Sequence, residues 1–240
     1  VKYIDTQKMK QKGNTMGKGL LYVISGPSGA GKGTICKRVL EELDIDGVQM
    51  VCYKAFGDIP YAPGGITREK AEDRRGNLLR ITNAGTSGNT SRDLKNRFDR
   101  DVVNLNPQWV SICIGINDVW RQFDSPAMTD ICCDLDEYEA NLREMIEKIK
   151  DKVKGIFLIT PYYIEPNKKD MMRARMDEYC AVCKKLAKEY GCVFVDFQSM
   201  FEDYCKIRHS SYLAWDRVHP NQIGATLMAK EFLSHCGYKY

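Results

Sequence analysis

The chain has 240 residues, a length that suits one large α/β domain or one domain with an appendage. Its composition, with 43% hydrophobic and 28% charged residues, is typical of a globular protein in water, and no apolar run reaches the roughly 20 residues of a membrane-spanning helix. The net charge of +4 is spread along the chain and forms no basic cluster of the kind that binds nucleic acid. We therefore expect neither a membrane nor a nucleic acid as a partner.

The ten cysteines do not indicate a disulfide scaffold. Such scaffolds are typical of small secreted domains, whereas this chain is large and its polar, lysine-rich N-terminus has no signal-peptide pattern. Cys180 and Cys183 form a CxxC pair, but no second pair or nearby histidine completes a zinc site. We expect reduced, buried thiols in a cytoplasmic protein, with no metal and no cofactor.

The first 47 residues contain the pattern of a phosphate-binding loop. Residues 1–18 are polar and without periodicity, which predicts a disordered leader. A strand, a glycine-rich loop and a helix are then predicted at 19–25, 26–34 and 35–43. In such a loop the backbone amides and a lysine hold phosphate oxygens at the helix N-terminus. The expected contacts come from Gly26, Gly31, Lys32 and Thr34.

This segment resembles the opening of guanylate kinase and related nucleoside monophosphate kinases. Gly33 stands between Lys32 and Thr34, as some kinases of that group permit. After Leu43 the resemblance ends, with no acidic strand end for magnesium, no arginine-rich lid and no guanine-binding segment. We interpret residues 19–47 as a fused fragment that binds phosphate or nucleotide weakly, in preference to a working kinase.

The next part of the chain is predicted as a strand, a loop and a second turn. An apolar strand at 48–56 ends in Gly-Asp-Ile at residues 57–59. Residues 61–76 are rich in glycine, proline and charge, which predicts a loop with room for a short helix. The polar turn at 83–89 precedes an amphipathic helix at 91–104.

The stretch from Trp109 to Ile114 organises the rest of the chain. It is apolar and β-prone and stops at Gly115, which predicts a buried parallel strand with Asn117 and Asp118 just past its carboxyl end. Ligands of open α/β sheets bind at such ends. The remaining strands and helices alternate, which predicts a three-layer αβα sandwich with a parallel sheet. The helices are expected at 134–153, 170–190 and 221–232, and the strands at 155–160 and 192–196.

Asp216 and His219 lie near the C-terminus, three residues apart, so that both side chains can converge from one turn. His209 and His235 lack such a partner in the sequence and are expected at the surface. Tyr162 and Tyr163 follow a predicted strand, where they could line a cleft or pack in the interior. The sequence leaves these two possibilities open.

Taken together, these segments resemble the SGNH hydrolases, also called GDSL-type esterases, from about Val48 to the C-terminus. Three blocks match: the second at residues 83–89, the third, Gly-Ile-Asn-Asp-Val-Trp, at 115–120, and the fifth, Asp-Arg-Val-His-Pro, at 216–220. The resemblance implies that His219 acts as general base and then general acid, and that Asp216 orients it. It also implies that Gly85 and Asn117 donate hydrogen bonds to an oxyanion.

The first block of the family is not matched. In the family the first strand ends in Gly-Asp-Ser, and that serine is the nucleophile. Here Ile59 stands in its place, and only 24 residues, Ile59 through Thr82, separate Asp58 from Asn83, fewer than the family's usual crossover. Ser28 lies on a comparable predicted strand-to-helix turn and is an alternative nucleophile.

The resemblance implies an esterase that removes acetyl or another small acyl group from a carbohydrate-like substrate, impaired by Ile59. Two other functions stay open. One is a binding protein of the SGNH fold without catalytic activity. The other is a nucleotide-binding, nucleoside monophosphate kinase-like protein that acts through loop 26–34. The expected domains are a leader at 1–18, a phosphate-loop fragment at 19–47 and an SGNH-type domain at 48–240.

Overall fold

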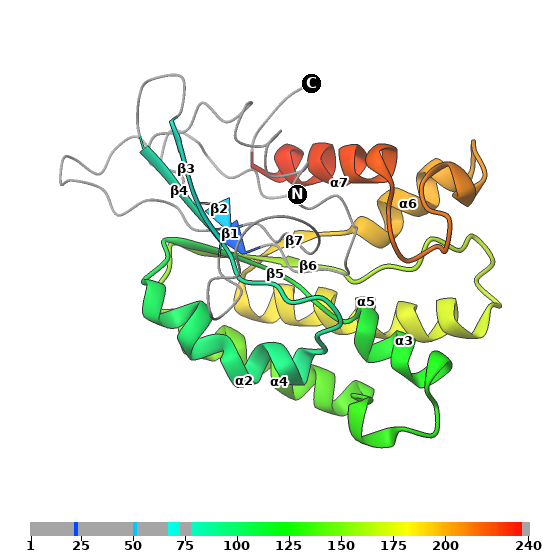
Figure 1. The fold of residues 1–240 in the computed structure, drawn as a ribbon, viewed down its shortest axis with the longest axis horizontal. Coiled ribbons are helices and arrows are strands. Elements are labelled where there is room, and N and C mark those ends of the chain that lie inside the picture. The colour runs from blue at the N-terminus through cyan, green and yellow to red at the C-terminus, as the bar shows by residue number, and fades with distance from the viewer. Residues whose placement is uncertain (1–21, 24–49, 52–66, 73–77, 237–240) are drawn as a thin grey trace.

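The computed structural model describes residues 22–23, 50–51, 67–72 and 78–236 (Figure 1). The predicted leader at 1–18, the phosphate-binding loop at 26–34 and the Gly-Asp-Ile segment at 57–59 lie outside these residues. The folded part that carries the three matching blocks is described almost without interruption.

The predicted central strand is confirmed as β5 (Trp109–Cys113), whose five residues are all buried. It pairs in parallel with β6 (Gly155–Ile159), and β6 pairs in parallel with β7 (Val193–Val195). The register places Trp109 opposite Gly155. Full burial on both faces explains why these strands are continuous apolar runs in the sequence and do not alternate.

Four further strands extend the fold beside β5. β1 (Tyr22–Val23) and β2 (Met50–Val51) form a short parallel pair, and β3 (Thr67–Glu72) and β4 (Leu78–Asn83) form an antiparallel pair. β1 contacts β5, and β2 contacts β4 (Figure 1).

The prediction of a loop or short helix in residues 61–76 is wrong where β3 lies. The sequence Thr-Arg-Glu-Lys-Ala-Glu has little intrinsic β propensity, and its charges suit a helix or a loop equally well. The strand forms because β4, which is more apolar, pairs with it along all six residues. Pairing with β4, which is separated from the end of β3 by only five residues, here overrides the local preference.

Helices cover both faces of the sheet, as predicted (Figure 1). One layer contains α2, α4 and α5, and the other contains α6 and α7, while α3 follows β5 at its carboxyl end. Of the described helices, none is long and apolar enough to cross a membrane. The bounds are α2 Ser91–Asp101, α3 Ile116–Asp124, α4 Leu135–Ile149, α5 Met171–Tyr190, α6 Phe197–Cys205 and α7 Gln222–His235, with short 3₁₀ turns η1 Val103–Leu105, η2 Thr129–Ile131 and η3 Ser210–Tyr212.

The helix starts follow from polar caps in the sequence. Thr90 and Asp93 form a reciprocal capping box at the start of α2, and the side chains of Asp134, Asp170 and Asn221 accept hydrogen bonds from the first turns of α4, α5 and α7. Pro220 lies one residue before the cap of α7 and forms a β-bridge with Ala214.

The core joins the sheet to α7 through aromatic contacts. The ring centroids of Trp109 and Phe157 are 5.3 Å apart, and those of Phe157 and Phe232 are 4.9 Å apart. A Cβ at Gly155 would lie only 2.4 Å from the Trp109 ring, so this position requires glycine. The aromatic packing thereby fixes β5 against β6 in the observed register.

Candidate active site

The carboxyl end of β5 delivers the predicted Asn117 to the interior through a sharp turn at Gly115. The backbone φ of Gly115 is +127°, and a Cβ there would lie 3.0 Å from both Pro161 and the ring of Tyr138. Only glycine adopts this conformation readily and fits in this space. The turn starts α3, and Asn117 lies buried in its first turn.

The second and third blocks meet at this point. The side-chain amide of Asn117 donates to the backbone carbonyl of Asn89, over 2.9 Å. Asn89 belongs to the turn that follows β4, in which Gly88 has a left-handed φ of +78° and Gly85 is buried. The structure therefore brings the turn containing Gly85 next to Asn117, as the resemblance implied.

Arg97 from α2 fixes this turn at two points. Its Nε donates to Oδ1 of Asn89 over 2.8 Å, and its Nη1 donates to the backbone carbonyl of Ala84. The same Nη1 pairs with the fully buried carboxylate of Asp101, 2.8 Å away. Burial opposes ionisation of Asp101, but hydrogen bonds from Arg100 and Arg97 outweigh it, so the pKa of Asp101 is lowered.

Asp118, the neighbour of Asn117, ties α3 to the start of α2. Its carboxylate accepts from the backbone N–H of Ser91 at 3.0 Å and from the Ser91 hydroxyl. Asn141 of α4 donates to that hydroxyl over 3.0 Å. Complete burial raises the pKa of Asp118 to about 6, although the hydrogen bonds from Ser91 favour the charged form.

The fifth block forms the Asp216–His219 pair that its spacing predicted. Nδ1 of His219 is hydrogen-bonded to Oδ2 of Asp216. The other carboxylate oxygen accepts from the backbone N–H groups of Val218 and His219, at 3.0 and 2.8 Å. Burial acts against the charge of Asp216, but these hydrogen bonds prevail and lower its pKa. Because Nδ1 faces Asp216, Nε2 is the ring nitrogen that can exchange a proton with a substrate.

Trp120, which the sequence analysis did not single out, connects this pair to the third block. Its ring meets that of His219 edge to face, with centroids 5.6 Å apart and an interplanar angle of 71°. The guanidinium of Arg121 lies 5.2 Å from the centroid of the Trp120 ring. Since Trp120 and Asn117 share α3, the contact places His219 beside the helix that carries Asn117. Its place in the matched Gly-Ile-Asn-Asp-Val-Trp block was the signal available in the sequence.

The other two histidines do not join this site. His209 is exposed and bonds to the Ser211 hydroxyl, 2.9 Å away. His235 is only partly exposed, and Glu231 lies one turn before it on α7, with its carboxylate 3.7 Å away. Nδ1 of His235 lies closer to the backbone carbonyl of Glu231, at 2.8 Å, than to its carboxylate.

The two tyrosines after β6 pack in the interior, which settles the alternative in favour of packing. Both are buried, and the ring of Tyr162 lies 5.0 Å from that of Phe201. The eight cysteines of the described residues are free thiols, and Cys183 lies 3.1 Å from the Tyr138 hydroxyl. Within the same residues, no group of three or more His, Cys, Asp or Glu side chains is arranged to hold a metal ion.

A comparison with known families identifies the class of protein that this fold and site define. The model of the GDSL-like lipase/acylhydrolase family matches residues 62–227, and the chain belongs to this family. This membership makes it a carboxylic ester hydrolase by class. The match begins after Ile59 and includes the second, third and fifth blocks.

Similar proteins share most of this chain. An acetylxylan esterase of Geobacillus stearothermophilus is 49% identical over 162 residues, which are 68% of this chain and 74% of that protein. The crystal structure of Axe2, an acetylxylan esterase of the same organism, covers 93% of this chain and 95% of its own, with 36% identity and a TM-score of 0.73. The structure of LAE5, an α/β hydrolase from the metagenome of Lake Arreo, covers 66% of this chain and 73% of its own, with 49% identity and a TM-score of 0.65.

Three similar structures are described as catalytic mutants of Axe2. In one of them alanine replaces a serine, in another an aspartate and in the third a histidine. The aspartate and the histidine of Axe2 are three positions apart in its sequence, which is also the spacing of Asp216 and His219 here.

The N-terminal stretch has different relatives. The guanylate kinase of Clostridioides difficile is 78% identical over 27 residues, which are 11% of this chain and 13% of that kinase. This match confirms the resemblance of the N-terminal fragment to guanylate kinase. It spans far too little of the kinase to carry its activity over.

Asp118 should make the stability of the fold depend on pH. Its carboxyl group has a pKa of about 6 in the folded protein, against an ordinary value of 3.8. Because the folded pKa is the higher one, Asp118 favours folding most strongly below pH 3.8, and this contribution is lost as the pH rises to about 6. Asp118→Asn should therefore gain about 2–3 kcal/mol of unfolding free energy relative to the unchanged protein between about pH 4 and pH 7.

Urea unfolding of both proteins across this pH range measures the effect. Any hydrogen bond that asparagine makes less well adds a constant offset, which does not change with pH. Asp151→Asn, at an exposed position, is the control and should show no pH-dependent difference. A difference between Asp118→Asn and the unchanged protein that stays flat across the range would contradict this assignment.

Proposed function

We propose that this chain hydrolyses acetyl or other small acyl esters carried by a carbohydrate. The observation that carries the proposal is the Asp216–His219 pair, which lies beside Trp120 on the helix that also holds Asn117. A base held by a carboxylate, next to amide donors at the carboxyl end of a parallel sheet, is suited to acyl transfer. The acetylxylan esterase relative supports an acetylated sugar as substrate.

Each residue of the site has a role in this reaction. Nε2 of His219 takes a proton from the attacking oxygen and returns it to the leaving alcohol, while Asp216 keeps the ring in the required tautomer and stabilises its charged form. Asn117 uses one of its two amide hydrogens on Asn89 and retains the second for an oxyanion. The backbone N–H of Gly85 is the other proposed donor, and each donor of this kind is typically worth ~10²–10³ in turnover.

Ile59 stands at the sequence position expected for the nucleophile. It has no hydrogen-bonding side chain and cannot form an acyl-enzyme, so the nucleophile expected after the strand predicted at 48–56 is missing. His219 and the oxyanion donors alone support only slow attack by water. If the rate proves to be zero while acylated sugar still binds, the chain is a binding protein of this fold.

A specific observation favours Ser28 as an alternative. The site lies at the carboxyl end of β5. Apart from β6, with which β5 pairs, the described strand that contacts β5 is β1. Ser28 follows β1 by five residues, whereas Ile59 follows β2, which contacts β4. The strand beside β5 is the one best placed to deliver a nucleophile to His219.

His219 should be the one histidine on which hydrolysis depends. We expect His219→Ala to abolish hydrolysis of p-nitrophenyl acetate, and the unchanged protein to lose rate toward acid pH because protonation of the imidazole removes the base. His209→Ala and His235→Ala are matched controls and should change the rate little. Equal losses in all three variants would show that the Asp216–His219 assignment is wrong.

Ile59→Ser tests the missing nucleophile. If the end of the second strand still faces His219, the new hydroxyl should raise the hydrolysis rate by at least about tenfold. The gain is limited by the short segment before Asn83, because about 1 Å of misplacement costs ~10². The initial rate with p-nitrophenyl acetate measures this change.

Ser28→Ala, with Ser25→Ala as its neighbouring control, separates the two positions. A fast unchanged protein that Ser28→Ala inactivates would place the nucleophile after the first strand and would refute the interpretation of Ile59. No change in either serine variant, together with a gain in Ile59→Ser, would support the second strand.

We also propose that loop 26–34, within an appended fragment of residues 19–47, binds phosphate or nucleotide weakly. The short match to guanylate kinases supports a loop of the right sequence, and one loop with one helix end is an incomplete site. Titration with ATP and GMP should show millimolar binding at best, with Lys32→Ala as the control. Micromolar binding lost in Lys32→Ala, together with phosphate transfer to GMP, would favour the kinase-like function over the esterase.

A further inference from the structure

Arg217, between the two residues of the proposed catalytic pair, has an unusual backbone conformation. Its φ is +65°, a left-handed value that it shares with Asn106 alone among the non-glycine residues that the structure describes. A side chain at this φ crowds its own backbone, so the conformation persists only where the surroundings hold it. Arg217 therefore needs contacts that hold it in place.

The contacts come from three consecutive residues that follow β6. The backbone carbonyl of Arg217 accepts from the N–H of Ile164 over 2.8 Å. Its guanidinium forms an ion pair with Glu165 and lies 5.6 Å from the centroid of the Tyr163 ring. Both the backbone and the side chain of Arg217 are thus bound to one segment.

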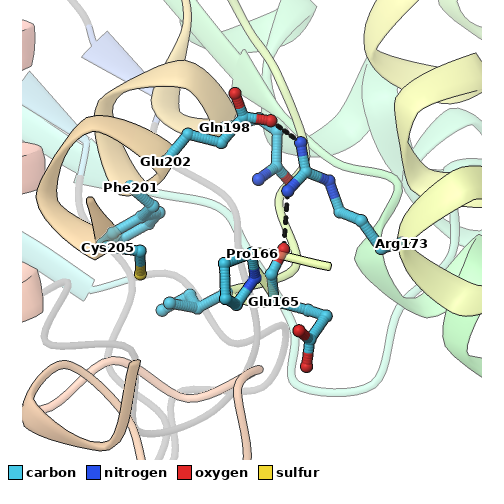
Figure 2. Close-up of a pocket in the computed structure, with 8 residues that line it drawn as sticks. Glu165, Pro166, Arg173, Gln198, Phe201, Glu202 and Cys205 are labelled. Atoms are coloured by element: carbon cyan, nitrogen blue, oxygen red, sulfur yellow. Dashed lines mark hydrogen bonds and ion pairs between the residues drawn. The ribbon is translucent and has the colours of Figure 1, made fainter. Parts of the chain in front are cut away.

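That segment is itself fixed to α5 and α6. The side chain of Gln198 accepts from the N–H of Tyr163 over 2.8 Å and donates to its carbonyl over 3.2 Å. Arg173, almost fully buried, donates to the carbonyl of Glu165 over 2.6 Å and pairs with Glu202. Figure 2 shows Arg173 reaching from α5 to both of these groups. The support under Arg217 is therefore buried and hydrogen-bonded, not a mobile surface loop.

The loop from Ala214 to Pro220, which carries Asp216 and His219, is closed by separate contacts at its two ends. Ala214 and Pro220 form a β-bridge, and the N–H of Asn221 donates to the carbonyl of Leu213 over 2.6 Å. These contacts close the loop at its base but leave its middle to other interactions. Arg217 lies in the middle of this loop, between Asp216 and Val218. The backbone N–H of Val218 donates a hydrogen bond to Asp216.

We propose that Arg217 is a positioning residue, and that its ion pair with Glu165 sets the Asp216–His219 geometry. The inference rests on the proposed role of His219 as base. Rotation of the backbone at Arg217 would move Asp216 relative to the N–H groups of Val218 and His219 and would release the imidazole. Glycine would adopt the left-handed backbone of residue 217 without strain. Only a long cationic side chain such as that of Arg217, however, can also form the ion pair with Glu165.

Kinetics of four variants and one control variant test this proposal. Arg217→Ala should lower kcat with p-nitrophenyl acetate by about 10- to 100-fold with KM within about twofold, because a misplaced base slows the chemical step more than it weakens binding. Glu165→Gln, which keeps the shape and removes the charge, should show a similar but smaller loss. Arg217→Lys should restore part of kcat, since an ammonium keeps the charge without the planar fork.

Arg217→Gly separates the side chain from the backbone. Glycine accepts a φ of +65° without crowding, so full activity of this variant would show that only the backbone conformation matters and would overturn the role of the ion pair. The matched control is Arg208→Ala, because the Arg208 guanidinium lies over the Tyr212 ring at a similar 5.7 Å and is not part of the site. It should leave kcat unchanged.

A readout without turnover keeps the test independent of the esterase proposal. The proton on Nδ1 of His219, bonded to Asp216, should give a downfield NMR signal in the unchanged protein and in Arg208→Ala. The signal should be lost or broadened in Arg217→Ala and Glu165→Gln. If the unchanged protein hydrolyses no ester, the proposed function fails, and this signal still decides whether Arg217 positions His219. Retention of the signal and of kcat in Arg217→Ala, or absence of the signal from the unchanged protein, would overturn the proposal.

Discussion

The turn at Gly115 is the constraint on which the rest of the site depends. Tyr138 and Pro161 close around it and leave 3.0 Å for any added Cβ, while the Tyr138 hydroxyl donates to the carbonyl of Ile114 over 2.9 Å. The chain can leave the buried strand β5 and start α3 at once only because this residue has no side chain. Asn117, Asp118 and Trp120 all take their positions from that immediate start. Each then reaches a different part of the protein: the turn after β4, the start of α2, and His219.

The polar contacts of the site are buried in part and those of Asp118 fully. A buried polar group loses its contact with water, so each contact costs free energy, while together the contacts permit few arrangements of the site. Asp118 is charged at neutral pH in an environment that raises its pKa to about 6, so this carboxylate weakens the fold relative to a neutral group of the same shape. The same carboxylate fixes the position of α2 relative to α3. It thereby also fixes the two proposed oxyanion donors, Gly85 and Asn117. Arg97 acts in the same way on the turn that contains Gly85, with the buried Asp101 as its counter-ion. Such networks favour one geometry because a change of position would break several of these hydrogen bonds at once.

The sequence predicted the parts of this structure that depend on local patterns. The buried strand at Trp109, the capped starts of the long helices and the Asp216–His219 spacing all depend on residues within a few positions of one another. What failed depended on pairing partners that lie outside each local pattern. Residues 67–72 are a strand because β4 pairs with them, not because of their own preferences. The ion pair between Arg217 and Glu165 joins residues 52 positions apart, and nothing near either residue indicates it. The contact of Trp120 with His219 was missed for the same reason, although both lie in matched blocks.

The position of β1 ties together two parts of the chain that have different relatives. The acylhydrolase match begins at residue 62, and β1 belongs to the preceding stretch that resembles guanylate kinase. β1 nevertheless pairs with β2 and contacts both β4 and β5, so this strand is part of the packing of the hydrolase-like domain. A buried β5 needs apolar cover beyond β6, the strand with which it pairs, and β1 contacts it. Any apolar, β-prone strand of suitable length can meet that need, whatever its origin, whereas the residues that follow the strand decide whether a nucleophile faces His219. Structural completion of the sheet and chemical completion of the site are therefore separate requirements, and a strand from another family can satisfy the first without the second.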